Sequence, residues 1–135
     1  MRYNWEMTYT PGETAERSGF SLDTLRYYER IGLLDSVERN AGGQRVFNDD
    51  DLAWLGILRC LRDTGMPIAM MLRYAELARG GEATFAERAE LLEEHDRDIE
   101  AKIAALRDEQ VRIREKIEWY RANVHIAAKV DVGWA

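Results

Sequence analysis

The sequence predicts a mainly α-helical protein in which a small helix-turn-helix domain is followed by one long helix that pairs with a second copy of the chain. Residues 11–31 contain two short helices with capping residues and a glycine between them, which is the arrangement of a helix-turn-helix unit. Residues 83–124 contain neither glycine nor proline, and an apolar side chain recurs at every seventh position, as in a coiled coil. We therefore expect a helix-turn-helix domain with its linker helices at 8–81, a dimerisation helix at 82–124 and a C-terminal tail at 125–135.

The two short helices have clear start and stop signals. Thr10 followed by Pro11 is an N-cap with proline at the first helical position, and Ser18-Gly19 closes this helix. Ser21 is a good N-cap for the second helix, because its hydroxyl can accept a hydrogen bond from a free N–H of the first turn. Gly32 is a natural C-terminal stop.

The second helix, at 21–31, is predicted to be the recognition helix and to have two different sides. Leu22, Leu25 and either Tyr28 or Glu29 follow the spacing of a buried face. An αα-hairpin inside a helical bundle has much the same spacing, so this alternative stays open at this point. The side predicted to face away from the core carries Asp23, Arg26, Tyr27 and Arg30.

A small β-hairpin is predicted at 36–47, where two short possible strands flank Gly42-Gly43. A two-stranded hairpin is marginally stable alone, so it must pack on the helices or be held by a partner. A hairpin directly after a helix-turn-helix unit is a winged arrangement, and the exposed side chains of Arg39 and Arg45 would suit phosphates. An ordinary surface loop with solvated arginines is the alternative.

Two further helices follow the hairpin. Asn48 caps a helix whose first turn holds three aspartates, where the helix dipole favours negative charge, and this helix ends at Gly65. Another short helix begins after Pro67 and ends at Gly80-Gly81.

The long helix at 83–124 has an apolar seam along its length. At 1.5 Å per residue it would be about 60 Å long, far too long for the preceding domain to cover. The economical partner is the same helix of a second copy, because most soluble oligomers are two-fold homodimers. The tail at 125–135 is expected to be irregular. One row of the seam is Phe85, Leu92, Ile99, Leu106, Ile113 and Tyr120, and a second row is Ala89, Ile103, Ile117 and Val124.

The formal net charge of −6 argues against a nucleic-acid partner, since phosphates call for a basic surface. However, residues 82–110 hold ten acidic and four basic side chains, so this segment alone accounts for the whole negative net charge of the chain. An acidic segment held apart from a local basic cluster would not prevent DNA binding. The candidate cluster is Arg17, Arg26, Arg30, Arg39 and Arg45.

Composition also excludes several classes of protein. The single cysteine, Cys60, cannot form an intrachain disulfide or a zinc site that needs several thiolates. No apolar run is long enough to span a bilayer and the N-terminus lacks the apolar core of a signal peptide, so a soluble cytoplasmic protein without membrane contact is expected. No nucleophile with a nearby base and no glycine-rich phosphate loop can be identified, so neither catalytic residues nor a cofactor are predicted.

Together these motifs resemble the MerR family of transcriptional regulators. The resemblance is close over about residues 8–80, and the long helix is similar only as a type of element. One departure is Gln44, where many relatives have an aromatic residue. The segments that carry the match are Tyr9-Thr10-Pro11-Gly12-Glu13-Thr14-Ala15, Leu25-Arg26-Tyr27-Tyr28-Glu29, Ile31-Gly32-Leu33-Leu34, Arg39 through Gly43-Gln44-Arg45-Val46-Phe47, and Asp50-Asp51-Leu52.

The resemblance implies a winged helix-turn-helix domain and an antiparallel coiled-coil homodimer. It also implies binding to double-stranded DNA at a near-palindromic operator, where the protein distorts the promoter so that the contacts of RNA polymerase realign. Arginines would mostly hold phosphates. The positions that match the DNA contacts of the family are Thr24, Arg26, Tyr27, Arg39, Gly43 and Arg45, with Arg17 and Ser21 as additions.

The sequence around Cys60 resembles the branch of the family that responds to aldehydes and to nitrosative or other thiol stress. In that branch a cysteine stands in the third helix, five residues before the equivalent of Gly65, and its thiolate would attack an electrophile. A small buried hydrophobic side chain at Cys60 is the structural alternative. Metal sensing is disfavoured, because no cysteine follows Cys60 and His95 and His125 alone are poor ligands for a soft metal.

Two alternatives to a thiol-responsive regulator stay open. The chain could be a regulator of the same family that responds to a small ligand without thiol chemistry. It could also be a coiled-coil adaptor whose N-terminal domain binds protein and not DNA. Salt-sensitive binding to an operator would separate the regulators from the adaptor.

Overall fold

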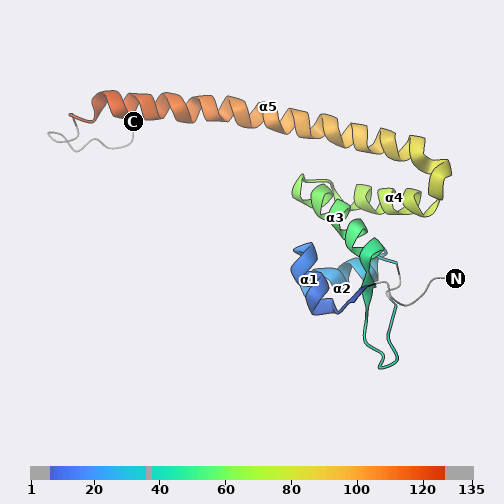
Figure 1. Cartoon of the computed structure of the whole chain (residues 1–135). Coiled ribbons are helices and arrows are strands. Elements are labelled where there is room, and N and C mark those ends of the chain that lie inside the picture. Colours follow the sequence, from blue (N-terminus) through green and yellow to red (C-terminus); the bar gives the residue numbers. More distant parts are fainter. Residues whose placement is uncertain (1–6, 36–37, 127–135) are drawn as a thin grey trace. The chain divides into compact units, whose positions relative to one another are not determined.

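The computed structural model describes residues 7–35 and 38–126 and confirms the mainly helical fold (Figure 1). The chain divides into two compact units, Met1–Leu92 and Glu93–Ala135. No helix in the described ranges is long and apolar enough to cross a membrane. In chain order the elements are β1 (Thr8–Tyr9), α1 (Pro11–Ser18), α2 (Leu22–Ile31), β2 (Phe47–Asn48), α3 (Asp49–Asp63), α4 (Ile68–Arg79), a 3₁₀ turn η1 (Gly81–Thr84) and α5 (Phe85–Asn123).

The predicted helix caps of α1 and α2 are confirmed. Thr10 Oγ1 accepts a hydrogen bond from Glu13 N at 3.1 Å, and Glu13 Oε1 accepts one from Thr10 N at 3.0 Å, which is a capping box. These hydrogen bonds from the backbone and side chain of Thr10 lower the pKa of the Glu13 carboxyl. Ser21 Oγ caps α2 by accepting from Thr24 N at 3.1 Å. Gly19, with φ 78°, ends α1 in the left-handed conformation that glycine adopts without strain.

A short antiparallel pairing that the sequence did not predict joins the start of the chain to α3. Tyr9 lies opposite Phe47 in β2, and Thr8 lies opposite Asn48. The Tyr9 hydroxyl donates a hydrogen bond to Asp49 Oδ1 at 2.7 Å. This contact ties the segment before α1 to the first turn of α3.

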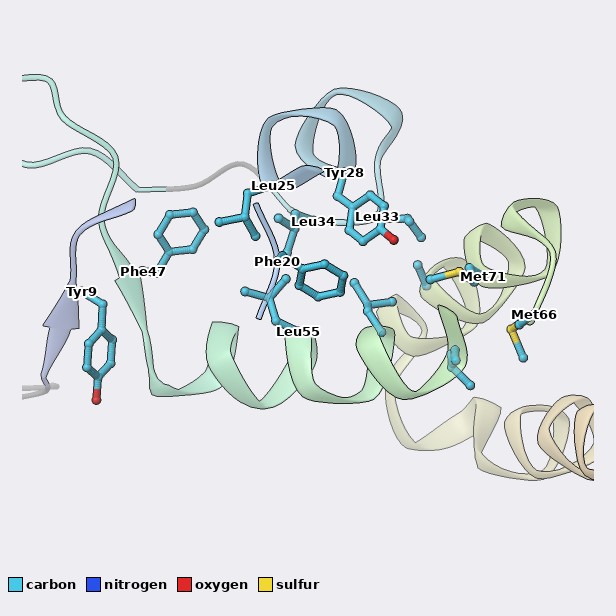
Figure 2. Packing of buried hydrophobic residues seen from close by; sticks show 13 residues of the cluster. Tyr9, Phe20, Leu25, Tyr28, Leu33, Leu34, Phe47, Leu55, Met66 and Met71 are labelled. Carbon is cyan, nitrogen blue, oxygen red and sulfur yellow. The ribbon is translucent and has the colours of Figure 1, made fainter. Parts of the chain in front are cut away.

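The core of the first unit lies along α3 and is closed by residues from every neighbouring element. Figure 2 shows Tyr9 and Phe47 at one end of this cluster and Met66 and Met71 at the other. Phe20, in the turn between α1 and α2, is 2% exposed and packs edge-to-face on Tyr28 with ring centroids 5.2 Å apart. The turn of the helix-turn-helix unit is therefore anchored by its own side chain in the core.

The predicted buried face of α2 is correct at two positions and wrong at one. Leu25 and Tyr28 are 3% and 4% exposed, whereas Leu22 is 39% exposed. Leu22 is the first residue of α2 and lines an open hollow of about 50 Å³ together with Phe47 and other side chains. Helical spacing places Leu22 on the same side as Leu25, but the core does not extend to the end of the helix.

The predicted hairpin is present as a narrow antiparallel loop, which we call the wing and define as residues 38–46 (Figure 1). It contains one isolated antiparallel bridge, between Arg39 and Arg45, and not the two strands that the sequence suggested. Asn40 organises the turn, because its Oδ1 accepts hydrogen bonds from Gly42 N at 2.9 Å and Gln44 N at 3.0 Å. Ser36 and Val37, at the start of the predicted hairpin, lie outside the described residues.

The long helix is confirmed as α5, Phe85–Asn123, within three residues of the predicted bounds. Its seam residues beyond position 100 are exposed in the single chain, as expected if a partner helix buries them in a dimer. The exposed fractions include 70% for Leu106, 61% for Ile113, 50% for Ile117 and 49% for Tyr120. Pairing with a second copy stays a prediction.

Candidate nucleic-acid interface

The outer side of α2 presents Arg26 and Tyr27 to solvent. The Arg26 side chain is 61% exposed, and its ion pair with Asp23 is 3.6 Å long and solvated, so it holds the arginine only weakly. Tyr27 is 40% exposed, whereas its neighbour Tyr28 is buried in the core. The guanidinium of Arg30 lies 5.4 Å from the centroid of the Tyr27 ring. This side of α2 combines positive charge with an amphipathic ring, a combination suited to phosphate and sugar.

The first turn of α2 holds two further predicted contacts. Ser21 Oγ donates a hydrogen bond to Thr24 Oγ1 at 2.9 Å and also accepts from Thr24 N. Ser21 is exposed and Thr24 is half-buried. The start of a helix carries free N–H groups and a partial positive charge that favour an anion, so both hydroxyls lie beside a position that suits a phosphate.

The two wing arginines, Arg39 and Arg45, are both engaged within the protein. Arg39 Nη1 donates a hydrogen bond to Gly43 O at 2.9 Å across the turn. Arg45 donates from Nε and Nη2 to Glu29 Oε1 of α2, at 3.2 Å and 3.0 Å. The wing is thus tied to α2 by a charged pair, and Arg45 lines the same hollow as Arg26.

Arg17 is exposed on α1 but lies over the Tyr9 ring, 4.8 Å from its centroid. Its ring contact is therefore with β1, whereas the other predicted contacts lie on α2 and the wing.

Cys60 is exposed on α3, so the interpretation as a small buried hydrophobic residue is wrong. Its two arginine neighbours reach the turn between α1 and α2. Arg59 Nη1 donates to Ser18 O at 3.2 Å, and the Arg62 guanidinium lies 4.6 Å from the centroid of the Phe20 ring. A side chain at Gly19 would place its Cβ 2.1 Å from Arg59 Nη1. The segment around Cys60 is therefore in contact with the helix-turn-helix turn.

A hollow of about 240 Å³ on another part of the first unit is lined by Asp35, Asp50 and Asp51, by apolar side chains that include Trp54, and by Arg79. Burial raises the pKa of the Asp51 carboxyl. Three carboxylates face one arginine that is itself paired with Asp35, so the lining has a net negative charge and is unsuited to phosphate. Across residues 7–35 and 38–126, no group of three or more histidine, cysteine or acidic side chains could hold a metal ion.

Residues 9–76 match the family model described as MerR HTH family regulatory protein. The chain belongs to this family. The predicted family resemblance is thereby confirmed, and the helix-turn-helix unit seen in α1 and α2 is that of a MerR-family regulator and not of an enzyme.

Individual relatives cover most of this MerR-family chain. An uncharacterized HTH-type transcriptional regulator from Haemophilus influenzae is 39% identical over 115 residues, which are 85% of either chain. The HTH-type transcriptional regulator AdhR from Bacillus subtilis is 32% identical over 76% of this chain and 64% of its own length. The crystal structure of HiNmlR, a MerR family regulator lacking the sensor domain and bound to promoter DNA, has a TM-score of 0.82 and 37% identity over 90% of this chain and 92% of that one.

Sequence reasoning missed two residues that shape this surface in the MerR-family fold. Helical spacing offers Glu29 only as a possible buried position, whereas the structure pairs it with Arg45 of the wing. Arg59 is absent from the predicted contacts, although its guanidinium covers Gly19 and donates a hydrogen bond to Ser18 O. The one signal available was the position of Glu29 at the end of the Leu-Arg-Tyr-Tyr-Glu string; nothing in the sequence places Arg59 against Gly19.

Proposed function

We propose that this transcriptional regulator binds promoter DNA as a homodimer, with α2 as recognition helix and the wing on the flanking backbone. The observation that carries the proposal is the exposure of Arg26 and Tyr27 on α2. The opposite side of this helix packs in the core, and the wing is bound to the same helix through Arg45 and Glu29. The proposed DNA contacts are Arg17, Ser21, Thr24, Arg26, Tyr27, Arg39 and Gly43, whereas Arg45 is engaged by Glu29. The similarity to HiNmlR, whose crystal structure is bound to promoter DNA, supports DNA binding by this chain.

The dimer is proposed to form through α5, with the helices antiparallel and the exposed seam at the interface. A two-fold protein places two recognition helices on a near-palindromic operator at a fixed spacing. The proposed division is a DNA-binding domain with linker helices at 8–81, a dimerisation helix at 82–124 and a tail at 125–135. Control of transcription would then follow from distortion of the promoter DNA between the two half-sites, which alters its fit to RNA polymerase.

A gel-shift assay on the near-palindrome upstream of the gene tests this proposal. We expect a complex that forms on the palindrome but not on a scrambled duplex and that weakens steeply as salt rises, because bound phosphates release counterions. Equal retention of both duplexes, or no complex at low salt, would contradict the proposal and favour the adaptor interpretation.

For the signal, we propose that Cys60 reacts with aldehydes or related electrophiles. With an aldehyde, the thiolate sulfur forms a bond to the carbonyl carbon, the C=O π bond opens and the oxygen takes up a proton. The exposure of Cys60 supports access. The contacts of Arg59 and Arg62 with Ser18 and Phe20 offer a route from the thiol to the helix-turn-helix turn.

Replacing Cys60 with serine is expected to abolish the promoter response to formaldehyde or methylglyoxal while leaving operator affinity unchanged. Serine keeps the size of the side chain but is far less nucleophilic than a thiolate. The measurement is a promoter-reporter assay with each aldehyde, together with a gel shift of the purified variant. An undiminished response in the Cys60→Ser strain would rule out thiol sensing and support a regulator that responds to a small non-thiol ligand.

A further inference from the structure

Among the residues that the structure describes, one charged pair between side chains, Arg45 with Glu29, joins the wing to the recognition helix. The wing's backbone bonds are internal, such as Val46 N to Glu38 O at 2.8 Å and Asn40 N to Gln44 O at 2.9 Å. Within the described residues, the hydrogen bonds from wing side chains to α2 are those of Arg45 with Glu29. The angle between the wing and α2 therefore depends on this contact and on the chain at the base of the wing.

The Glu29–Arg45 pair is better shielded than the other ion pair on this surface. The Arg45 and Glu29 side chains are 31% and 23% exposed, compared with 61% and 95% for Arg26 and Asp23. Two N–H groups of Arg45 converge on one carboxylate oxygen, and the adjoining hollow of about 50 Å³ has Leu25 and Phe47 in its lining. Charge-assisted bonds in such a partly dry setting hold their geometry better than fully solvated pairs.

The Glu29 carboxylate also reduces the attraction between Arg45 and a DNA phosphate. A phosphate that approaches Arg45 meets a guanidinium already compensated by a carboxylate, and the Glu29 charge repels it. By contrast, Arg26 is held only by a long and solvated pair. Arg45 is therefore placed to orient the wing, and Arg26 is placed to take up a phosphate.

We propose that Glu29 and Arg45 are positioning residues that set the wing against the recognition helix, and that Arg45 is not a phosphate ligand. The inference rests on the proposed function, because the wing has to be set for DNA. It changes the role that the family resemblance implied for Arg45. It also gives the Glu29 carboxylate a role in DNA binding although its charge opposes DNA.

The variant Glu29→Gln separates the two roles of Arg45 by the sign of its effect. If Arg45 were a phosphate ligand, removing the neighbouring negative charge would tighten DNA binding. If the pair positions the wing, losing it weakens operator binding, by about tenfold for a charge-assisted bond. We expect weakening, measured by fluorescence anisotropy of a labelled operator duplex with the full-length chain.

The variants Arg45→Gln and Glu29→Gln/Arg45→Gln complete a double-mutant cycle. We expect the double variant to bind the operator no more weakly than Arg45→Gln, because the pair is already broken and the second change removes only the uncompensated Glu29 charge. In Arg45→Gln, the slope of log Kd against log salt should differ from the wild-type slope by less than one unit. Arg39→Gln is the matched control in the same wing, and its slope should fall by about one if Arg39 binds phosphate.

Amide hydrogen exchange of the free protein gives a readout that does not depend on DNA. We expect faster exchange at residues 38–46 in Glu29→Gln and Arg45→Gln, with α3 unchanged. Tighter binding by Glu29→Gln, or a slope reduced by one in Arg45→Gln with unchanged exchange of the wing, would overturn the inference. Failure of the wild-type chain to bind the operator would instead contradict the proposed function, and the exchange experiment would still decide whether the pair holds the wing.

Discussion

Replacing Phe20 with alanine is expected to lower the free energy of unfolding of the first unit by about 3–5 kcal/mol. The ring is 2% exposed, packs edge-on against Tyr28 and lies beneath the Arg62 guanidinium. Its removal leaves a cavity directly under the turn between α1 and α2. Because a domain is stable by only about 5–15 kcal/mol, this single change should bring the unit close to unfolding and abolish operator binding.

Urea denaturation followed by far-UV circular dichroism, at one fixed protein concentration, measures this loss. The concentration must be fixed because the stability of an associating protein depends on it. Leu22→Ala is the matched control, since Leu22 lies two residues away and is 39% exposed; its cost should stay below about 1 kcal/mol. Equal costs for Phe20→Ala and Leu22→Ala would show that the core does not reach the turn.

Replacing Arg26 with alanine is expected to weaken operator binding by about ten- to a hundredfold without loss of stability. The Arg26 side chain is 61% exposed and its partner Asp23 is 95% exposed, so the fold gains little from it. If Arg26 binds a phosphate, the slope of log Kd against log salt should also fall by about one. Fluorescence anisotropy of a labelled operator at several salt concentrations measures both quantities.

The control for Arg26→Ala removes an arginine outside the proposed interface. Arg97 is exposed on α5, two residues before Ile99 of the seam and outside both of its rows. Arg97→Ala should leave affinity and salt slope at the wild-type values. If both variants bind the operator alike, α2 is not the recognition helix.

The helices could be predicted closely because their signals act within one turn. Thr10, Ser21 and Asn48 each accept a hydrogen bond from the backbone N–H three residues later, at 2.9–3.1 Å, as their side chains favour. α5 could be predicted from its composition and heptad spacing. Neither the caps nor the heptad spacing of α5 depends on where the rest of the chain lies.

The candidate interface was less predictable, because its details depend on pairs far apart in the chain. Glu29 and Arg45 are 16 residues apart and Ser18 and Arg59 are 41 apart. Helical spacing placed Arg26 and Tyr27 on the surface of α2. It could not show that Arg45 is held by a carboxylate whereas Arg26 carries only a solvated pair.

Local sequence signals were enough to predict the capped helices, the wing between α2 and α3, the long apolar seam and the family to which these motifs belong. The folded structure was needed to show that Leu22 lies outside the core, that β1 pairs with β2, that Cys60 is exposed and that Arg45 pairs with Glu29. The physical reason is the range of the interactions. Caps and helical periodicity act between residues a few positions apart, whereas burial and ion pairing are decided when distant segments pack on α3.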